Sequence, residues 1–264
     1  MIPNHRRIAI FPRKRYGQHF LHDPQVIARI VAAIDPRPGE HLVEIGPGRG
    51  ALTASLVQRI GKLDAIEIDR DLARELASRF GSALTIDARN VLDVDFAALR
   101  AGGPKLRVVG NLPYNISTPL LFHLLGQRAE IADMHFMLQK EVVDRMAAAP
   151  GSKIYGRLTV MLAPWVRIER LFTVGPGAFS PPPRVSSAIV RVVPLPEPAF
   201  DIGPAPHFDR IVRAAFSQRR KTLRNSLKET IDPALFVQLG IDDGARPEQL
   251  APAQFGALAR AAAG

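Results

Sequence analysis

Glu44-Ile-Gly-Pro-Gly-Arg-Gly50 joins a strand-like run at residues 41–45 to a helical run at residues 52–60. Glycine allows the main chain to approach a ligand closely, and the first turn of a helix favours an electron-rich group. An ordinary tight turn from strand to helix accounts for the same glycines equally well. Their spacing differs from the G-x-G-x-x-G pattern of dinucleotide-binding proteins, so the segment does not favour a nicotinamide cofactor.

Strand-like and helical runs alternate on both sides of this junction, which predicts an α/β fold with a mostly parallel sheet and helical crossovers. Helical spacing begins at Asp23-Pro24, a combination typical of a helix start. Helices are predicted at residues 24–34, 52–60, 71–80 and 119–125. Strands are predicted at residues 41–45, 63–68, 83–86, 106–109, 134–138, 166–174 and 187–193.

Prolines crowd the sequence after the last predicted strand, at positions 194, 196, 198, 204 and 206. We therefore predict a boundary near residue 195, between a sheet domain at residues 23–195 and a small all-α domain at residues 200–264. Helical patterns in the second domain occupy residues 208–228, 233–239, 247–250 and 252–263. Residues 1–22 contain no acidic residue, and they are either a basic arm that contacts phosphate or a frayed, solvated terminus.

The composition excludes several classes of protein. The 264 residues are 47% hydrophobic and 23% charged, which permits a buried core. The absence of cysteine excludes a disulfide scaffold, a thiol nucleophile and a thiolate zinc site, and no other metal-ligand cluster is visible. No run is apolar enough to span a membrane and no signal peptide is recognisable, so we expect a cytoplasmic protein. The formal net charge of +10 favours nucleic acid as a partner.

Acidic residues end the two predicted strands that follow the glycine-containing turn. Glu67 stands 21 positions after Gly46 (67 − 46), where a carboxylate can accept hydrogen bonds from two ribose hydroxyls. Asp87 ends the next strand and could accept from an exocyclic adenine amine. Glu67 alone could be a solvated loop carboxylate, but the carboxyl ends of neighbouring parallel strands share one ligand-binding edge of the sheet. Together the two acids predict a cofactor that contains adenosine and lacks a pyrophosphate.

The segment Gly110-Asn-Leu-Pro-Tyr-Asn-Ile-Ser117 follows the fourth predicted strand. Asn111 supplies a neutral acceptor, Pro113 stiffens the loop, and Tyr114 supplies an aromatic face. An amine conjugated with an aromatic ring is a poor nucleophile, and acceptors for its hydrogens favour a pyramidal, reactive geometry. A turn with a buried tyrosine is the plainer alternative. The order of these residues at a strand end favours chemistry on the amine of a stacked base.

On these motifs the chain resembles the KsgA-type small-subunit rRNA adenine dimethyltransferases, a family of class I S-adenosylmethionine-dependent methyltransferases. Asn111-Leu-Pro-Tyr114 is the motif of class I adenine N6 methyltransferases. The resemblance implies a Rossmann-like, mostly parallel seven-stranded sheet with a small all-α C-terminal domain. It also rests on Tyr16-Gly-Gln-His-Phe-Leu21, Val43-Glu-Ile-Gly-Pro-Gly48, Ile66-Glu-Ile-Asp69, Phe136-Met-Leu-Gln-Lys-Glu141, Tyr155-Gly-Arg-Leu158, Phe179-Ser-Pro-Pro-Pro-Arg184 and Gln218-Arg-Arg-Lys-Thr-Leu-Arg-Asn225.

The resemblance implies a set of contacts with the cofactor, S-adenosylmethionine. His19 and Leu21 are expected near its methionine end, and Gly46 beneath it. Glu67 is expected to bind the ribose hydroxyls and Asp87 the adenine amine. The family usually has Asn at the position of His19, and a neutral imidazole can donate one hydrogen bond as an amide does.

The resemblance also implies the residues that handle the target base. Asn111 is expected beside the transferred methyl group, in the loop that Pro113 stiffens. The target adenine is expected to stack on Tyr114, with Phe179 covering its other side. The base must leave its stack to reach the methyl group. No general base is needed, because a methylated amine is acidic enough to lose its proton to water.

A basic row falls on the predicted helix 208–228. Arg213, Arg220, Arg224 and Lys228 are spaced to share one helical face, and Lys221 adds to the charge. Such a row is often a solvated face. The net charge and the methyltransferase motifs favour a clamp for RNA phosphates.

The motifs and the resemblance together predict transfer of two methyl groups to N6 of adenosine in rRNA. The resemblance implies that the targets are two adjacent adenosines in the hairpin near the 3′ end of the small-subunit rRNA, with a role in ribosome biogenesis. S-adenosylmethionine is the expected methyl donor, without a metal. The expected partner is the small-subunit rRNA or its precursor particle, bound by a monomer. One alternative is a large-subunit rRNA dimethyltransferase that confers antibiotic resistance; such proteins commonly have Ile where Leu112 stands. The other is a mainly non-catalytic ribosome-assembly factor.

Overall fold

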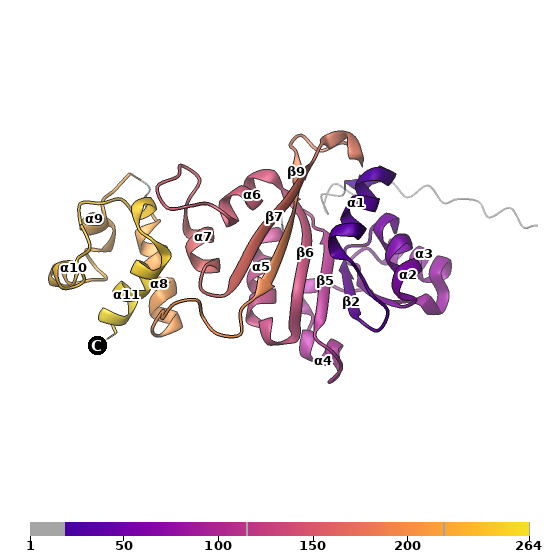
Figure 1. The fold of residues 1–264 in the computed structure, drawn as a ribbon, viewed down its shortest axis with the longest axis horizontal. Helices are drawn as coiled ribbons and strands as arrows, with labels where there is room; N and C mark the ends of the chain where they lie inside the picture. The colour runs from indigo at the N-terminus through magenta and orange to yellow at the C-terminus, as the bar shows by residue number, and fades with distance from the viewer. Residues whose placement is uncertain (1–18, 115, 219, 264) are drawn as a thin grey trace, which may run out of the picture. The chain divides into compact units, whose positions relative to one another are not determined.

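The computed structural model describes residues 19–114, 116–218 and 220–263 (Figure 1). The predicted basic arm therefore lies almost wholly outside the described residues. Contacts divide the chain into two compact units. The first contains the chain up to Gln139 together with Leu171–Ile189, and the second contains Lys140–Arg170 together with the chain from Val190 onward.

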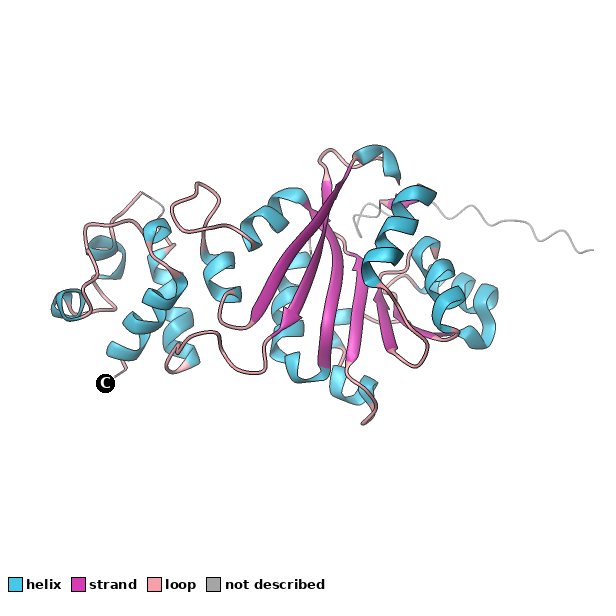
Figure 2. Ribbon diagram, viewed as in Figure 1, coloured by secondary structure: helices cyan, strands magenta, loops and turns pink. Residues whose placement is uncertain are grey.

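A seven-stranded sheet confirms the predicted α/β fold. Its strands, drawn in magenta in Figure 2, follow the order β4-β3-β2-β5-β6-β9-β7. The pairs β2–β3, β3–β4, β2–β5 and β5–β6 are all parallel. The chain runs outward from β2 through β3 to β4 and then returns to β5 on the other side of β2, which makes the β2/β5 junction a topological switch point where ligands bind in such folds. The bounds are β2 His41–Ile45, β3 Leu63–Ile66, β4 Leu84–Asp87, β5 Leu106–Asn111, β6 Ile131–Gln139, β7 Val166–Val174 and β9 Ser187–Pro194.

The sequence did not predict a second sheet, in which β1 (Phe20–Leu21) pairs with β8 (Phe179–Ser180) in antiparallel register. Phe20 faces Ser180 and Leu21 faces Phe179 in this ladder. The main-chain N–H of His22 continues it, donating to the Ala178 carbonyl at 3.0 Å. The pairing fixes residues 19–22 beside a segment that lies far away in the sequence.

Helices α1 (Pro24–Ile34) and α2 (Ala51–Ile60) pack on the sheet of the first unit. The predicted start of α1 is confirmed, because Asp23 accepts from the main-chain N–H groups of the second and third residues that follow it and Pro24 occupies the first turn. Buried residues of both helices share one apolar cluster with strand residues of β2, β3 and β5. The remaining helices of this unit are α3 Arg70–Phe80, α4 Phe96–Arg100 and α5 Ser117–Gly126.

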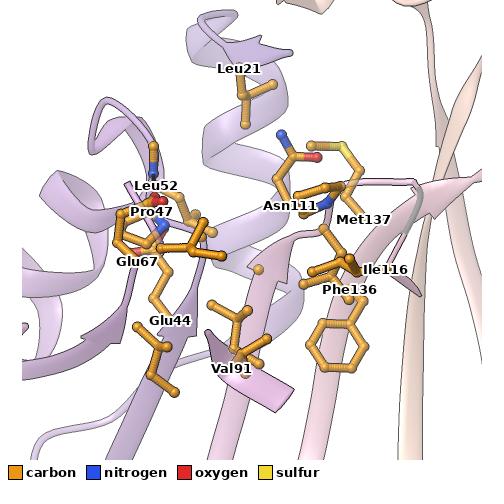
Figure 3. Close-up of a pocket in the computed structure, with 18 of the residues that line it drawn as sticks. Leu21, Glu44, Pro47, Leu52, Glu67, Val91, Asn111, Ile116, Phe136 and Met137 are labelled. Atoms are coloured by element: carbon orange, nitrogen blue, oxygen red, sulfur yellow. Dashed lines mark hydrogen bonds between the residues drawn. The ribbon is translucent and has the colours of Figure 1, made fainter. Parts of the chain in front are cut away.

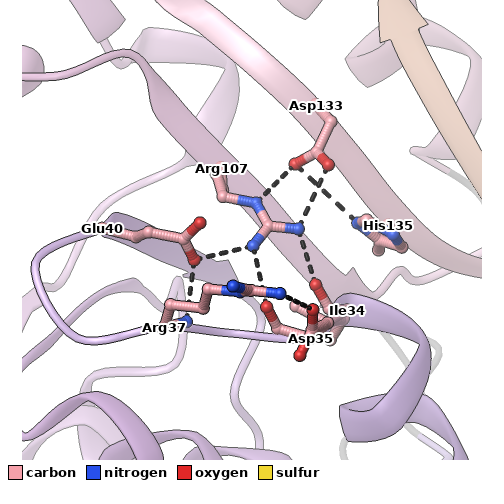
Figure 4. Close-up of polar contacts among 7 residues, drawn as sticks. All are labelled: Ile34, Asp35, Arg37, Glu40, Arg107, Asp133 and His135. Atoms are coloured by element: carbon pink, nitrogen blue, oxygen red, sulfur yellow. Dashed lines mark hydrogen bonds and ion pairs between the residues drawn. The ribbon is translucent and has the colours of Figure 1, made fainter.

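An ion-pair network secures the end of α1 to the sheet (Figure 4). The guanidinium of Arg107 on β5 donates to the Ile34 carbonyl at 2.6 Å. It also pairs with Glu40 at 2.7 Å and with Asp133 on β6 at 2.8 Å. The Arg107 side chain is 13% exposed, so these partners replace the water that a buried guanidinium loses. The network thereby connects the last turn of α1 to two strands.

The second unit does not begin at the predicted domain boundary near residue 195, because it also contains residues 140–170. Tyr155 and Val160, which precede that boundary, belong to the same buried cluster as Phe208 and Phe255. The Tyr155 hydroxyl also donates to the Leu250 carbonyl at 2.8 Å. The proline-rich sequence marks where the chain leaves the sheet. The compact unit instead includes every segment that packs into this buried cluster. The helices of the second unit are α6 Lys140–Met146, α7 Arg157–Leu162, α8 Ala205–Ala215, α9 Leu223–Leu227, α10 Pro233–Gln238 and α11 Pro252–Ala261.

The predicted continuous helix at residues 208–228 is wrong. Helix α8 ends at Ala215, and α9 begins only at Leu223. The main-chain N–H groups of Leu223 and Arg224 donate to the carbonyls of Ala245 and Asp243, both at 2.9 Å. These bonds give the first turn of α9 partners from another segment, so a new helix starts there. The predicted helix at 247–250 is a single 3₁₀ turn, Pro247–Gln249.

Candidate functional site

A cavity of about 340 Å³ lies at the carboxyl ends of β2, β3 and β5, at the switch point of the sheet (Figure 3). Its walls come from the segments that directly follow these strands, from residues 89–92 after β4, from residues 135–137 of β6 and from His19–Leu21. All the residues that line it belong to the first compact unit. Clefts of this size at this position bind small-molecule cofactors.

The glycine-containing turn forms one wall of this cavity. Gly46, Gly48 and Gly50 have φ values of 66°, 58° and 75°, a region that other residues rarely adopt. The turn therefore requires glycine whether or not a ligand binds. A Cβ atom on Gly46 would meet nothing closer than the Asn111 carbonyl at 3.9 Å, so the main chain at Gly46 faces open space in the cavity. This opening is what a close main-chain approach to a ligand needs.

Glu67 follows β3 and lies in the cavity with 4% of its surface exposed. One carboxylate oxygen accepts from the Asp69 N–H at 2.9 Å, and the other accepts from the Gly48 N–H at 3.2 Å. Burial raises the pKa of Glu67, and these two N–H groups oppose that shift. Both oxygens keep lone pairs that can accept from a ligand, as the sequence predicted for ribose hydroxyls.

Glu44 is a second carboxyl group in the cavity, and the sequence motifs predicted no role for it. It is 2% exposed and accepts from the Thr53 hydroxyl at 2.6 Å. Burial, with a smaller contribution from the nearby charge of Glu67, raises the pKa of Glu44 to about 7. An acidic residue within the apolar run of β2 was the signal that could have identified it. The two carboxyl groups suit a positively charged ligand.

Asp87 ends β4 as predicted but does not line the cavity. Its carboxylate accepts from the Arg89 guanidinium at 2.5 Å, and Arg89 itself lines the cavity together with Asn90. The main-chain carbonyl of Asp87 accepts from the N–H of Glu67 at 3.0 Å, so the two acids are adjacent. The adenine contact that the sequence predicts for Asp87 stays a prediction.

Asn111, Pro113 and Tyr114 all line the cavity beyond the end of β5. The Asn111 amide Nδ2 donates to the main-chain carbonyl of His19 at 3.1 Å. A carbonyl can only accept, so this bond fixes the orientation of the amide and leaves Oδ1 as the atom with unused acceptor capacity. The hydroxyl of Tyr114 is hydrogen-bonded to Ser187 at 2.9 Å, and burial raises the pKa of Tyr114.

His19 and Leu21 reach the cavity from the N-terminal side, whereas Phe179 does not. Leu21 is 8% exposed and lines the cavity. The His19 ring lies 6.0 Å from the Tyr114 ring, centroid to centroid, with an interplanar angle of 31°. Phe179 is 3% exposed and packs in the same apolar cluster as Leu21, its partner in the ladder, but it is not one of the residues that line the cavity. Its proposed cover over the target base stays a prediction.

The basic residues of the second unit do not form the predicted single row, because α8 and α9 are separate helices. Arg213 pairs with Asp209 at 2.9 Å, and Arg224 pairs with Asp243 at 2.7 Å. Lys228 lies 3.8 Å from Glu229. Arg220 and Lys221 are exposed in the segment between the two helices.

The described part of the chain offers neither a metal site nor a membrane-spanning helix. Across residues 19–114, 116–218 and 220–263, histidine and acidic side chains form no group of three or more that could hold a metal ion. Over the same residues, no helix has the length and apolar character that crossing a membrane requires.

The sequence matches the family model described as ribosomal RNA adenine dimethylase over residues 11–263. A protein of Xylella fastidiosa (strain Temecula1), named Ribosomal RNA small subunit methyltransferase A, is 56% identical over 253 residues, which cover 94% of this chain and 95% of that protein. A protein of the same name from Xanthomonas euvesicatoria pv. vesicatoria is 56% identical over 250 residues, with the same coverage.

Two solved structures share the fold over nearly the whole chain. A dimethyladenosine transferase from Plasmodium falciparum has a TM-score of 0.75 at 24% identity, covering 91% of this chain and 96% of that one. The 23S rRNA methyltransferase ErmE has a TM-score of 0.69 at 27% identity, covering 92% of this chain and 99% of that one.

Proposed function

The chain belongs to the ribosomal RNA adenine dimethylase family, and on this basis we propose that it dimethylates N6 of adenosine in small-subunit rRNA with S-adenosylmethionine as the methyl donor. The choice of the small ribosomal subunit rests on sequence identity. The small-subunit relatives are 56% identical over nearly the full chain, whereas the 23S rRNA methyltransferase is 27% identical. This difference favours the small subunit over the large-subunit alternative.

The cavity fits S-adenosylmethionine. When bound, this cofactor supplies an electrophilic methyl carbon on a positively charged sulfur. Glu67 would hold its ribose, because both carboxylate oxygens are oriented by main-chain N–H groups and keep acceptor capacity. Gly46 would pass beneath it, at the place where a side chain is missing from the wall. Glu44 adds a buried carboxyl group that a cationic ligand would stabilise in its charged form.

Asn111 and Tyr114 would act on the target base. The orientation of the Asn111 amide supports this role, since Nδ2 is bound to His19 and Oδ1 can accept from the amine of the base. Accepting its hydrogens draws the nitrogen lone pair out of conjugation, which makes the amine nucleophilic. Tyr114 would hold the flipped base by stacking, with its ring fixed through Ser187. The amine proton passes to water.

The finer features of the substrate come from the family resemblance. They are two adjacent adenosines in the 3′-terminal hairpin and a precursor small-subunit particle as the form that is bound. The resemblance likewise suggests that the protein acts as a monomer in the cytoplasm. Arg220 and Lys221 support RNA binding because both side chains are exposed. Arg213, Arg224 and Lys228 would contribute if phosphates share or displace their acidic neighbours.

Methyl transfer to isolated particles tests the proposal. Purified protein, labelled S-adenosylmethionine and small-subunit particles from cells that lack this activity are incubated together, and methylated adenosines are mapped by reverse-transcription stops. We expect two dimethylated adenosines in the small-subunit rRNA, and a strongly reduced yield of both with Asn111→Ala. Methylation of large-subunit rRNA alone would support the antibiotic-resistance alternative. Binding to the particle without methylation by the wild type would support an assembly factor.

A further inference from the structure

His19 lies where three segments of the first unit meet. Its ring nitrogen Nδ1 is 2.8 Å from the Pro181 carbonyl oxygen. Its own main-chain carbonyl accepts from the Asn111 amide at 3.1 Å. Its ring stands beside the Tyr114 ring. A single residue therefore connects the loop after β8 to both residues proposed to act on the target base.

The side chain of His19 extends the ladder between β1 and β8. Residues 20, 21 and 22 face residues 180, 179 and 178 in that ladder, so His19 stands opposite Pro181. Proline has no main-chain N–H, so it cannot donate to the facing strand. The imidazole of His19 uses the acceptor that Pro181 does offer. Because a carbonyl oxygen only accepts, Nδ1 carries the proton in this contact.

The same contact bears on the orientation of Asn111. The Nδ1–H bond to Pro181 holds His19 from one side, and the main-chain carbonyl of His19 receives the Asn111 amide on the other. A shift of this carbonyl would release Nδ2 and let the amide turn about its last side-chain bond. Oδ1 would then no longer be held as the atom that accepts from the target amine.

We infer that the His19 side chain is a positioning residue for methyl transfer, acting through its bond to Pro181 to hold the Asn111 amide with Oδ1 available to the target amine. This inference rests on the proposed function. It differs from the cofactor contact that the family resemblance implies for His19, because the donor of the ring already has a protein partner. It assigns the residue an effect on the rate of transfer rather than on the affinity for S-adenosylmethionine.

The chemistry of the side chain gives matched variants. The Nδ2 of asparagine and the Nδ1 of histidine are both attached to Cγ, so His19→Asn keeps a donor within reach of Pro181. His19→Leu keeps a branched side chain without a donor. His19→Phe keeps a ring beside Tyr114 and also lacks the donor.

Single-turnover methylation of small-subunit particles and equilibrium titration with S-adenosylmethionine measure the two effects separately. Loss of one orienting hydrogen bond corresponds to about tenfold in rate, or about 1.4 kcal/mol. We expect about this loss for His19→Leu and His19→Phe, near-wild-type rates for His19→Asn, and unchanged cofactor affinity in all three. In an Asn111→Ala background, His19→Leu should produce no further loss of methyl-transfer rate, because the Asn111 amide that His19 orients is already absent. Cofactor titration also reports whether each variant is folded.

Three results would overturn the inference while leaving the proposed function intact. One is a wild-type rate in His19→Leu and His19→Phe. Another is a loss of cofactor affinity at an unchanged rate, which would make His19 a cofactor contact. The third is an equal further loss in the Asn111→Ala background, which would show that His19 does not act through Asn111. Failure of the wild type to methylate any particle would instead refute the proposed function.

Discussion

Replacing Glu67 with glutamine tests the assignment of the cofactor ribose. Both carboxylate oxygens accept main-chain N–H groups, from Asp69 and from Gly48. Glutamine keeps the size of the side chain but has one oxygen and one NH₂ group, so one of those N–H groups would face another donor. The variant also loses the negative charge that strengthens hydrogen bonds from two ribose hydroxyls.

The magnitude follows from these contacts. Hydrogen bonds to a charged acceptor contribute about 1.5–3 kcal/mol, which corresponds to a Kd for S-adenosylmethionine that is roughly 10- to 150-fold higher in Glu67→Gln. The same change lowers the melting temperature of the free protein, because the Gly48 turn loses an acceptor. Glu75→Gln on the exposed side of α3 is the matched control and should change neither quantity.

Isothermal titration with S-adenosylmethionine and with its demethylated product provides the assay, and thermal melting of the free proteins provides the stability measurement. A folded Glu67→Gln protein with wild-type affinity would remove Glu67 from the ribose site. A lower melting temperature with unchanged affinity would assign Glu67 to the architecture of the turn alone.

Four further predictions concern the rest of the machinery. Asn111→Ala should abolish most turnover in single-turnover assays while particle affinity stays near normal, and a strong loss of affinity would contradict this. Tyr114→Ala should slow transfer by a factor corresponding to about 1–3 kcal/mol of lost stacking, whereas Tyr114→Phe keeps the aromatic face and most of the rate. Glu44 has a pKa raised from 4.5 to about 7 in the folded state, so the folded protein binds more protons than the unfolded chain between these values and stability falls as pH rises through this range. Glu44→Gln should remove this fall in chemical denaturation between pH 4.5 and 7, and an unchanged pH profile would refute the assignment. The double change Arg220→Ala, Arg224→Ala should lower the log–log salt slope of particle binding by about 0.7–0.9 per lost phosphate contact without changing cofactor affinity, and an unchanged slope would make these residues a solvated face.

The sheet and several residues of the cavity wall could be predicted from local sequence. Apolar runs gave the seven strands, and the ends of parallel strands brought Gly46, Glu67 and Asn111 to one edge. These features depend on residues close together in the chain and on a fold rule that applies to every such sheet. The glycine-containing turn was also correctly placed, although its positive φ angles alone account for its glycines.

Contacts between residues far apart in the chain could not be predicted from local sequence. The two-residue strands β1 and β8 are too short to show a periodic pattern, and each finds its main-chain partner in the other. Arg107 is a charged residue within a predicted strand. Its partners on α1, on the loop after α1 and on β6 are identified only in the folded chain. The break between α8 and α9 likewise depends on carbonyl groups some 20 residues further along the chain.

The roles of Asp87 and Phe179 show a second limit. Each stands at the end or start of a strand where the family resemblance places it. The direction of a side chain at such a point depends on its neighbours: Arg89 binds the Asp87 carboxylate, and the apolar cluster takes up Phe179. Sequence position therefore located these residues near the site without fixing what they contact.

The bond from His19 to Pro181 spans 162 residues and has a consequence for synthesis of the chain. During translation, the segment that carries His19 emerges long before the segment that completes its ladder. At about 5–20 residues per second, the partner strand follows roughly 8–30 s later. Until then a nascent chain can form the glycine-containing turn and the Asn111 loop, but residues 19–22 have no β8 to pair with. The cavity therefore gains its N-terminal wall late, after strands β2 to β7 have been synthesised, and a product truncated before residue 179 would be left with an open site.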